Sequence, residues 1–375
     1  METIQMKKQL LAVAVASAFA STAFAANVTV YGTVDTGLVY THQSFGGALP
    51  TNGDSSKFSM DSGVLGASKF GFKGTEDLGD GYSVSFQLEN GFKADTGAMS
   101  GADDNKLFDR EARLSLNTPY GTVSFGRMGA LTSGLGSYDV FQAAGDAMDG
   151  GYSDYIGTGY WFSRDRYDNM ITLVTPEANG FTGYAQYSFQ TKGTENANER
   201  ANTRYAALGL TYKAGALEAV VVADTVLRTS TEEKTYSDAQ AYSFGVNYDF
   251  GVTKAFFGAQ YGNHENIEFK FNTATTGTAK TYNNYFKGYN LHIGAATPLP
   301  CGTLTVSAYY GDYEAENDNT VTAKKYGFGA MHEYAISKRT TFYTGAGFSQ
   351  AELEQADRAA RVKGVNVTLG LNHKF

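Results

Sequence analysis

The chain has 375 residues and a formal net charge of −8, and it is rich in Gly (44), Tyr (26) and Phe (25) but poor in Pro (5). The negative charge disfavours a general nucleic-acid binder, because such proteins need a basic surface. The single cysteine, Cys301, excludes an internal disulfide and any zinc site that needs several thiolates. Abundant Gly and aromatic residues without long apolar runs indicate many twisted strands.

The first 25 residues are expected to be a secretory signal peptide. Lys7 and Lys8 precede the apolar stretch QLLAVAVASAFASTAFA, which ends in the small-x-small sequence Ala23-Phe24-Ala25. No stop-transfer pattern follows, so we favour cleavage over a membrane anchor or a buried helix. Residues 26–375 then form the mature domain, which works outside the cytoplasm.

From Asn27 onward the dominant hydrophobic period is two, the period of a half-buried strand. The segments VTVYGTVDTGLVY, YSVSFQLEN and AYSFGVNYDF show it clearly. Sixteen strands are predicted, at 28–40, 68–73, 82–90, 108–117, 121–127, 166–175, 181–190, 204–213, 216–225, 241–250, 252–261, 287–297, 303–312, 324–334, 340–349 and 362–375.

Short and long connections alternate along the chain. The short ones contain the Gly, Asp, Asn and Pro of tight turns, at 76–81, 118–121, 176–180, 213–216, 249–252, 298–302 and 336–339. The long ones are polar, at 41–61, 93–106, 129–158, 190–202, 227–238, 263–284, 313–323 and 350–361. This alternation places all turns on one rim and all loops on the other.

The polar side of these strands contains Ser, Gln, Asn, Glu, Asp and Lys, which favours a water-filled lumen. Strands of roughly ten residues fit a tilted crossing of a bilayer, with apolar residues outward. A soluble sandwich or propeller is the alternative, but its strands are usually shorter. The sequence therefore predicts an all-β fold, a sixteen-stranded antiparallel transmembrane barrel.

Aromatic residues lie in or beside most of the short turns. If the turns share one rim, these residues form a ring at the membrane–water boundary. The expected members are Tyr82, Tyr120, Phe181, Tyr212, Phe250, Phe342 and the terminal Phe375.

The third loop, 129–158, is rich in Gly and lacks strand alternation. A structureless segment of this length in a compact domain is usually functional. Its small and aromatic residues favour packing against a wall, so we expect it to fold into the lumen and constrict the pore. The alternative is a mobile surface loop.

Charged residues on the polar side of the strands and in this loop are candidates for the pore constriction. Bases facing acids would create a transverse field that screens solutes by charge, although each residue alone also fits a solvated or ion-paired charge. The wall candidates are Lys69, Lys73, Arg113, Arg127, Arg164, Arg166, Asp35 and Glu89, and the loop candidates are Asp139, Asp146, Asp149 and Asp154. Arg110 occupies a position whose parity, its place in the alternation of side chains along the strand, predicts that it faces lipid. It is therefore left out of this set.

Several stretches in the first half of the mature chain, together with the terminal Phe375, resemble the general porins of Gram-negative bacteria, especially the beta-proteobacterial type. They are VTVYGTVDTGL, SKFGFKGTEDLGDGYSVSFQLENGF, FDREARLSLNTPYGTVSFGR and TPEANGFTGYAQYS. The resemblance implies a trimeric outer-membrane barrel with short periplasmic turns, long extracellular loops and an inward-folded third loop. It also implies a basic wall cluster at Lys69, where Arg is more usual, Arg113 and Arg127, and a role for Phe375 as the assembly signal.

The function expected on these grounds is passive, size- and charge-dependent diffusion of ions and small hydrophilic solutes across the outer membrane. The expected partners are two further copies of the chain, outer-membrane lipid and lipopolysaccharide, and the barrel-assembly machinery, with no cofactor, metal or nucleic acid. A substrate-specific channel or an adhesin or receptor barrel are alternatives. A barrel enzyme is disfavoured because the five histidines show no nearby catalytic arrangement. Ion selectivity stays open, since the net charge favours cations and the candidate bases favour anions.

Overall fold

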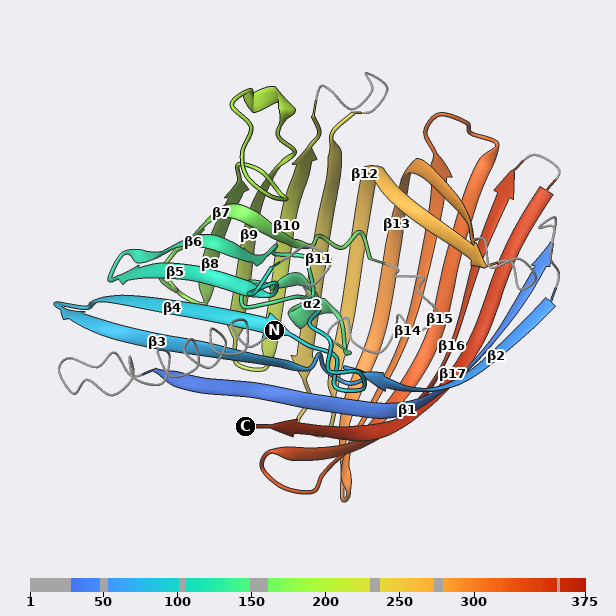
Figure 1. The fold of residues 1–375 in the computed structure, drawn as a ribbon, viewed down its shortest axis with the longest axis horizontal. Coiled ribbons are helices and arrows are strands. Elements are labelled where there is room, and N and C mark those ends of the chain that lie inside the picture. The colour runs from blue at the N-terminus through green and yellow to red at the C-terminus, as the bar shows by residue number, and fades with distance from the viewer. Residues whose placement is uncertain are drawn as a thin grey trace, which may run out of the picture.

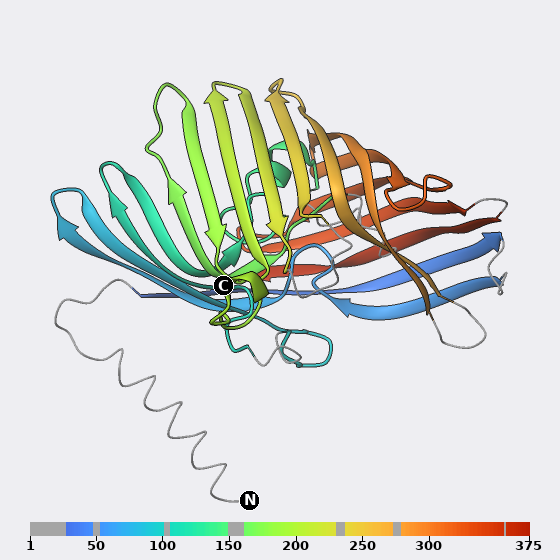
Figure 2. The ribbon, with the colours of Figure 1, turned by 90° about the horizontal axis from the view of Figure 1, so that it is seen from above.

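The computed structural model describes residues 28–47, 53–100, 106–148, 161–229, 237–272, 279–355 and 358–375. Their strands form one sheet that closes on itself, with every neighbouring pair antiparallel (Figures 1 and 2). The strands are β1 (Thr29–Gly47), β2 (Gly53–Ser62), β3 (Lys69–Gly79), β4 (Tyr82–Gly91), β5 (Glu111–Thr118), β6 (Gly121–Gly129), β7 (Arg166–Val174), β8 (Phe181–Ser188), β9 (Arg204–Ala214), β10 (Leu217–Leu227), β11 (Ala239–Asp249), β12 (Lys254–Asn272), β13 (Ala279–Leu299), β14 (Gly302–Ala315), β15 (Val321–Ala335), β16 (Thr340–Gln355) and β17 (Arg358–Lys374). Two short helical elements accompany them, α2 (Phe141–Gly145) and the 3-10 turn η1 (Glu199–Ala201).

The described strands occupy sixteen positions around the barrel, although there are seventeen segments. β2 pairs with β1 from Thr36 to Phe45, whereas β3 pairs with β1 from Thr29 to Thr33. β2 and β3 therefore share one side of β1 and form one position between them. The sixteen positions predicted from the sequence are confirmed.

The last strand closes the barrel against the first. β1 and β17 pair from Thr33↔Lys374 to Gly47↔Ala360. Beyond that ladder, the amide of Gly32 donates to the carbonyl of Phe375 (3.1 Å), and the amide of Phe375 donates to the carbonyl of Gly32 (3.0 Å). A Cβ on Gly32 would lie 2.3 Å from the Phe375 ring, so the missing side chain makes room for that ring. Phe375 therefore extends the seam between β1 and β17 by one residue pair.

Three expected loops are largely strand instead, which corrects the prediction. Residues 41–61 contain the end of β1 and all of β2 except Ser62, and residues 263–284 contain the end of β12 and the start of β13. Residues 350–361 contain the end of β16 and the start of β17. Antiparallel pairing satisfies the backbone groups of both arms of a hairpin, so the ladders continue past the point where the alternation weakens.

Apolar side chains face outward and polar side chains face inward, the reverse of a soluble core. In β17 the exposed apolar residues are Val365 (41 %), Val367 (50 %), Leu369 (46 %) and Leu371 (47 %), and the buried polar residues are Asn366, Thr368 and Asn372. Among the described residues, no helix is long and apolar enough to cross a bilayer. An apolar outer surface on a closed sheet is what a membrane-spanning barrel presents to lipid.

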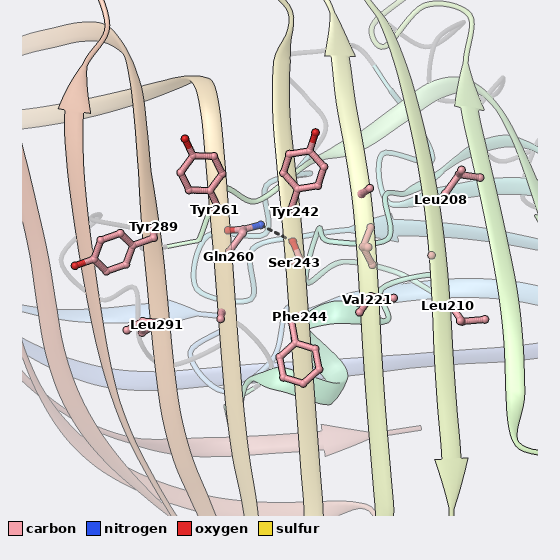
Figure 3. Close-up of a pocket in the computed structure, with 14 residues that line it drawn as sticks. Leu208, Leu210, Val221, Tyr242, Ser243, Phe244, Gln260, Tyr261, Tyr289 and Leu291 are labelled. Atoms are coloured by element: carbon pink, nitrogen blue, oxygen red, sulfur yellow. Dashed lines mark hydrogen bonds between the residues drawn. The ribbon is translucent and has the colours of Figure 1, made fainter.

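Aromatic residues mark both ends of this outer surface. Tyr242, Tyr261 and Tyr289 stand opposite one another on β11, β12 and β13, where they line one part of an apolar hollow of about 680 Å³ over β9 to β13 (Figure 3). At the other rim, the predicted ring members that are exposed are Tyr82, Tyr120, Phe181, Phe250 and Phe375, while Tyr212 and Phe342 are half-buried. Such rows suit the two membrane–water boundaries.

Candidate pore passage

The third loop connects β6 to β7 and lies inside the barrel (Figures 1 and 2). Its helix α2 packs against β10, β11 and β12. Phe141 is fully buried and lies edge-on to Trp161, with the ring centroids 4.8 Å apart. The small and aromatic residues of the loop therefore form its packing core, which is why it does not behave as a solvated loop. Residues 149–158, including Asp149 and Asp154, lie outside the described residues.

Three wall glycines let the loop backbone approach the strands closely. A Cβ on Gly245 of β11 would lie 3.0 Å from the Cα of Gly145, and one on Gly258 of β12 would lie 2.8 Å from the Gly145 carbonyl oxygen. A Cβ on Gly294 of β13 would lie 2.4 Å from the Cβ of Ala147. Residues 145–147 thus run across three neighbouring strands where the wall has no side chains.

Neutral amide groups hold the loop to the same side of the barrel. Asn247 of β11 donates its Nδ2 to the carbonyl of Ala144 (3.0 Å), and Gln260 of β12 accepts the amide of Phe162 (2.6 Å). Each bond satisfies a buried backbone group of the loop that lies outside the hydrogen-bond ladders of the strands. Gln186 of β8 likewise accepts the amide of Leu131 (3.0 Å). The loop therefore rests on the wall formed by β10 to β13 and on Gln186.

Arg164 ties the end of the loop to this wall and is buried, with 7 % of its surface exposed. Its Nε donates to Asp224 (2.6 Å), and its two terminal nitrogens donate to Glu265 (2.8 and 2.7 Å). Thr132, near the start of the loop, also donates to Asp224 (3.2 Å), so both limbs of the loop meet at one carboxylate. Arg164, predicted as a filter residue, is in the structure a buried partner of two buried carboxylates and lines neither of the two cavities on the other side of the loop.

Two cavities lie on the other side of the loop, and both are lined by Lys69 and Arg110. One, of about 390 Å³, lies between β3 to β5 and the loop residues 134–143. The other, of about 490 Å³, lies between the loop residues Ala147 and Met148 and the strands β1 and β14 to β17. Because they share two cationic side chains, the cavities form one candidate passage.

Glu89 on β4 forms ion pairs with both bases of this passage. It pairs with Lys69 (3.2 Å) and with Arg110 (2.7 Å), and it accepts a hydrogen bond from the hydroxyl of Tyr31 (2.9 Å). The exclusion of Arg110 from the candidates was therefore wrong. Residues 107–110 form a bend before β5 begins at Glu111, so strand parity does not apply to Arg110.

Arg113 on β5 contacts the third loop, as its lumen-facing parity predicts. It donates to Glu111 (3.0 Å) and to Gln87 (2.8 Å), and its guanidinium lies 5.3 Å from the ring centroid of Tyr138. Glu111 in turn accepts the hydroxyl of Ser137 (2.9 Å). Arg113 and Glu111 therefore position the near edge of the loop beside the passage.

The other three predicted wall bases lie apart from the two cavities. Lys73 is exposed, with its ammonium 5.2 Å from the Tyr31 ring centroid. Arg127 donates to Asp168 (2.6 Å) and to the carbonyl of Arg166 (3.2 Å). Neither these residues nor the Arg166 side chain lines either cavity.

Asp35 is fully buried and organises the link between β2 and β3. Its carboxylate accepts the amides of Val64 (2.8 Å) and Gly66 (3.2 Å), the hydroxyl of Tyr343 (2.9 Å) and the Nδ2 of Asn372 (2.8 Å). The Leu65 amide is a fifth donor (3.4 Å). The prediction of Asp35 as a filter residue is corrected to a structural one, because five donors satisfy the buried carboxylate.

The two described loop acids differ in position. Asp139 lines the smaller cavity and accepts the amides of Gly134 (3.1 Å) and Ala143 (3.1 Å). Asp146 is buried against the wall, where it accepts the indole Nε1–H of Trp161 (3.1 Å). Only Asp139 of this described pair is placed to act on a solute.

Sequence reasoning missed Glu111 and His292 as well as Arg110. Glu111 shares the polar parity of Arg113, so that pattern could have found it. His292 lies on β13 and contacts the loop through Gly145, a pairing between residues far apart in the chain that no local pattern signals.

Comparisons with known proteins agree with this architecture. A protein-family model described as Gram-negative porin matches residues 12–352. An outer membrane porin protein of Bordetella pertussis is 31 % identical over 404 residues, covering 99 % of this chain and 100 % of the relative. Outer membrane porin protein 32 of Delftia acidovorans is 32 % identical over 216 residues, covering 57 % of this chain and 58 % of the relative.

Solved structures share the fold. The anion-selective porin from Comamonas acidovorans gives a TM-score of 0.61 at 23 % identity, covering 94 % of this chain and 100 % of that chain. The trimer form of OmpT from Vibrio cholerae gives 0.58 at 18 % identity, with the same two coverages.

Proposed function

Because the chain belongs to the Gram-negative porin family and forms an outer-membrane diffusion channel, we propose that ions and small hydrophilic solutes pass between the third loop and the β3–β5 wall. Lys69 and Arg110 are the side chains that they meet there. The observation that carries this proposal is that both residues line both cavities of the passage. Asp139 on the loop side gives the same passage an opposing charge.

The passage favours anions over cations of the same size. The side chain of Lys69 is 31 % exposed, whereas that of its partner Glu89 is 3 % exposed. A passing ion therefore meets the ammonium before the carboxylate, and in a narrow lumen with low-dielectric walls the nearest charge dominates. Lys374 and Glu333 add one base and one acid to the larger cavity, so they leave the balance to Lys69 and Arg110.

Reversal potentials in a KCl gradient across a planar bilayer test this proposal. The wild type is expected to show an anion preference, and the double variant Lys69→Gln/Arg110→Gln is expected to lose or invert it. Lys338→Gln, which removes an exposed charge in a short turn, is the matched control and should leave the potential unchanged. An unchanged potential in the double variant would place the route elsewhere.

Deleting residues 136–156 tests the part played by the third loop. This deletion removes α2 and the loop residues that border both cavities. If the loop constricts the route, the single-channel conductance rises. Unchanged conductance from a folded, heat-modifiable barrel would mean that the loop lies outside the path of the ions.

We further propose that the working unit is a homotrimer. Support comes from the shared fold with the trimer form of OmpT. Conductance increments in groups of three, and an oligomer in mild detergent that dissociates into monomers on heating, are the expected results. A folded, conducting monomer in the same detergent would contradict this proposal.

A further inference from the structure

The imidazole of His292 joins β13 to the loop at two points. Its Nδ1 lies 3.0 Å from the carbonyl oxygen of Gly145, and its Nε2 lies 3.3 Å from Oδ1 of Asp146. Both side chains are completely shielded from solvent. This contact is therefore a second ionisable contact between the loop and the wall formed by β10 to β13, besides the Arg164 cluster.

The geometry determines where the protons lie. A carbonyl oxygen only accepts, so Nδ1 of His292 carries a hydrogen. The Asp146 carboxylate already accepts the amide of Met148 at Oδ1 (2.9 Å) and the indole of Trp161 at Oδ2 (3.1 Å). Nε2 of His292 is then attracted to Oδ1 only if it also carries a proton. A neutral ring would set its lone pair against a carboxylate in a buried site, which is unfavourable.

The loop, β14 and β12 surround the His292–Asp146 pair. Asp146 is the charged group that the ring faces, from the loop. The Trp161 ring lies 6.1 Å from the imidazole, also from the loop, and Tyr309 on β14 stands opposite His292 in the ladder. From β12, Gly258 presents no side chain, so the loop backbone and the Trp161 ring fill that space.

This contact is connected directly to the passage. Ala147 and Met148 follow Asp146 in the chain and line the larger cavity together with Lys69 and Arg110. The Met148 amide is bonded to the same carboxylate oxygen that faces His292. Movement of Asp146 away from β13 therefore moves the lining of the cavity.

We propose that His292 and Asp146 form a proton-operated latch that positions the third loop. When the pair holds its shared proton, the loop segment 145–148 is fixed against β13 and the passage keeps its width. When that proton is lost, the repulsion between the ring nitrogen and the carboxylate releases the segment. The inference rests on the proposed route, since the latch affects transport only if residues 147 and 148 border that route.

Single-channel recordings from about pH 5 to about pH 9 test the latch, a range that spans the usual titration of histidine. In the wild type, the open-channel current noise is expected to rise several-fold with pH. In His292→Gln the side chain can still donate to Gly145 but cannot titrate, so the noise should be independent of pH. His42→Gln, which alters a histidine bonded to Ser56 near the end of β1, should behave as the wild type. Asp146→Asn should also be independent of pH and serves if His292→Gln does not fold.

A second measurement separates failure of the latch from failure of the proposed route. Met148→Cys, in a Cys301→Ser background, is treated with a water-soluble thiol reagent at each pH, with and without His292→Gln. The rate of thiol modification without His292→Gln is divided by the rate with it. This ratio cancels the pH dependence that comes from ionisation of the thiol itself. A ratio that rises with pH, together with flat current noise, would support the latch and place the route elsewhere. A flat ratio with flat noise, or noise that stays pH-dependent in His292→Gln, would overturn the latch.

Discussion

The wall formed by β10 to β13 and the wall formed by β3 to β5 contact opposite sides of the third loop in different ways. The first wall provides glycines, amides and two buried ionisable contacts, the Arg164 cluster and the His292–Asp146 pair. The second provides charged side chains that remain partly exposed, such as Lys69 and Arg110. In the proposed route, the first wall holds most of the loop, whereas the second wall positions its near edge and carries the charges that screen the solute. Substitutions on the first wall should change stability and pore geometry, and substitutions on the second should change ion selectivity.

Arg164→Met should have the largest effect on stability. It would leave Asp224 and Glu265 buried without their counter-ion, and breaking a buried pair in this way costs about 3–5 kcal/mol. The temperature at which the folded barrel converts to the unfolded form on a gel measures the loss. The open-channel noise should rise as well, because both limbs of the loop depend on Asp224.

Arg361→Met is the matched control for this prediction. Arg361 also pairs with a carboxylate, that of Glu352, but its side chain is 50 % exposed. Exposed pairs contribute about 0–1 kcal/mol, so the conversion temperature should barely change. Equal losses in the two variants would show that the Arg164 cluster is not the tether of the loop.

Gly258→Ala should have the next largest effect. The new methyl group would lie 2.8 Å from both the Gly145 carbonyl oxygen and the Trp161 ring, so the loop must shift away from β12. Overpacking of this kind costs about 1–3 kcal/mol. Conductance and the conversion temperature should both change. Gly46→Ala, where a Cβ meets no atom within 4 Å, should alter neither.

Most strands could be predicted from the sequence because each strand residue of a barrel in lipid faces either the lipid or the lumen. β17 shows this well, since its outward apolar residues and inward small or polar residues alternate without interruption from Val365 to Asn372. β2 was missed because its sequence, GDSSKFSMDS, is mostly polar. This strand pairs with β1 only from Thr36 to Phe45. Pairing with an existing edge, rather than hydrophobic periodicity, determines such a strand.

The candidate site could be predicted only in part, because parity gives the direction of a side chain but not its partners. Parity placed Lys69, Glu89 and Arg113 correctly on the lumen side. It failed for Arg110, which lies in a bend, and it could not distinguish the buried Asp35 from an exposed acid. One usable signal was overlooked: Gly245, Gly258 and Gly294 lie on the polar side of three consecutive strands.

Glu89→Gln should make the second wall more positively charged without moving the loop. The amide keeps the shape of the carboxylate but leaves Lys69 and Arg110 without their shared negative partner. The reversal potential should therefore shift further toward that of a perfectly anion-selective pore, and it should do so most at low salt. A shift toward cations would mean that Glu89 holds the bases in the route rather than offsetting them.

Lys73→Gln should have the smallest effect of the four. Lys73 is on the same strand and face as Lys69, and it carries the same charge, but it lines neither cavity and stacks on Tyr31. If the bases within the passage determine selectivity, its reversal potential should shift less than that of Lys69→Gln. The difference between the two variants should grow with ionic strength, because salt screens a charge beside open solution more than one within a narrow lumen. Equal shifts at every salt concentration would show that the charge of the whole wall, rather than the charge within the two cavities, selects the ion.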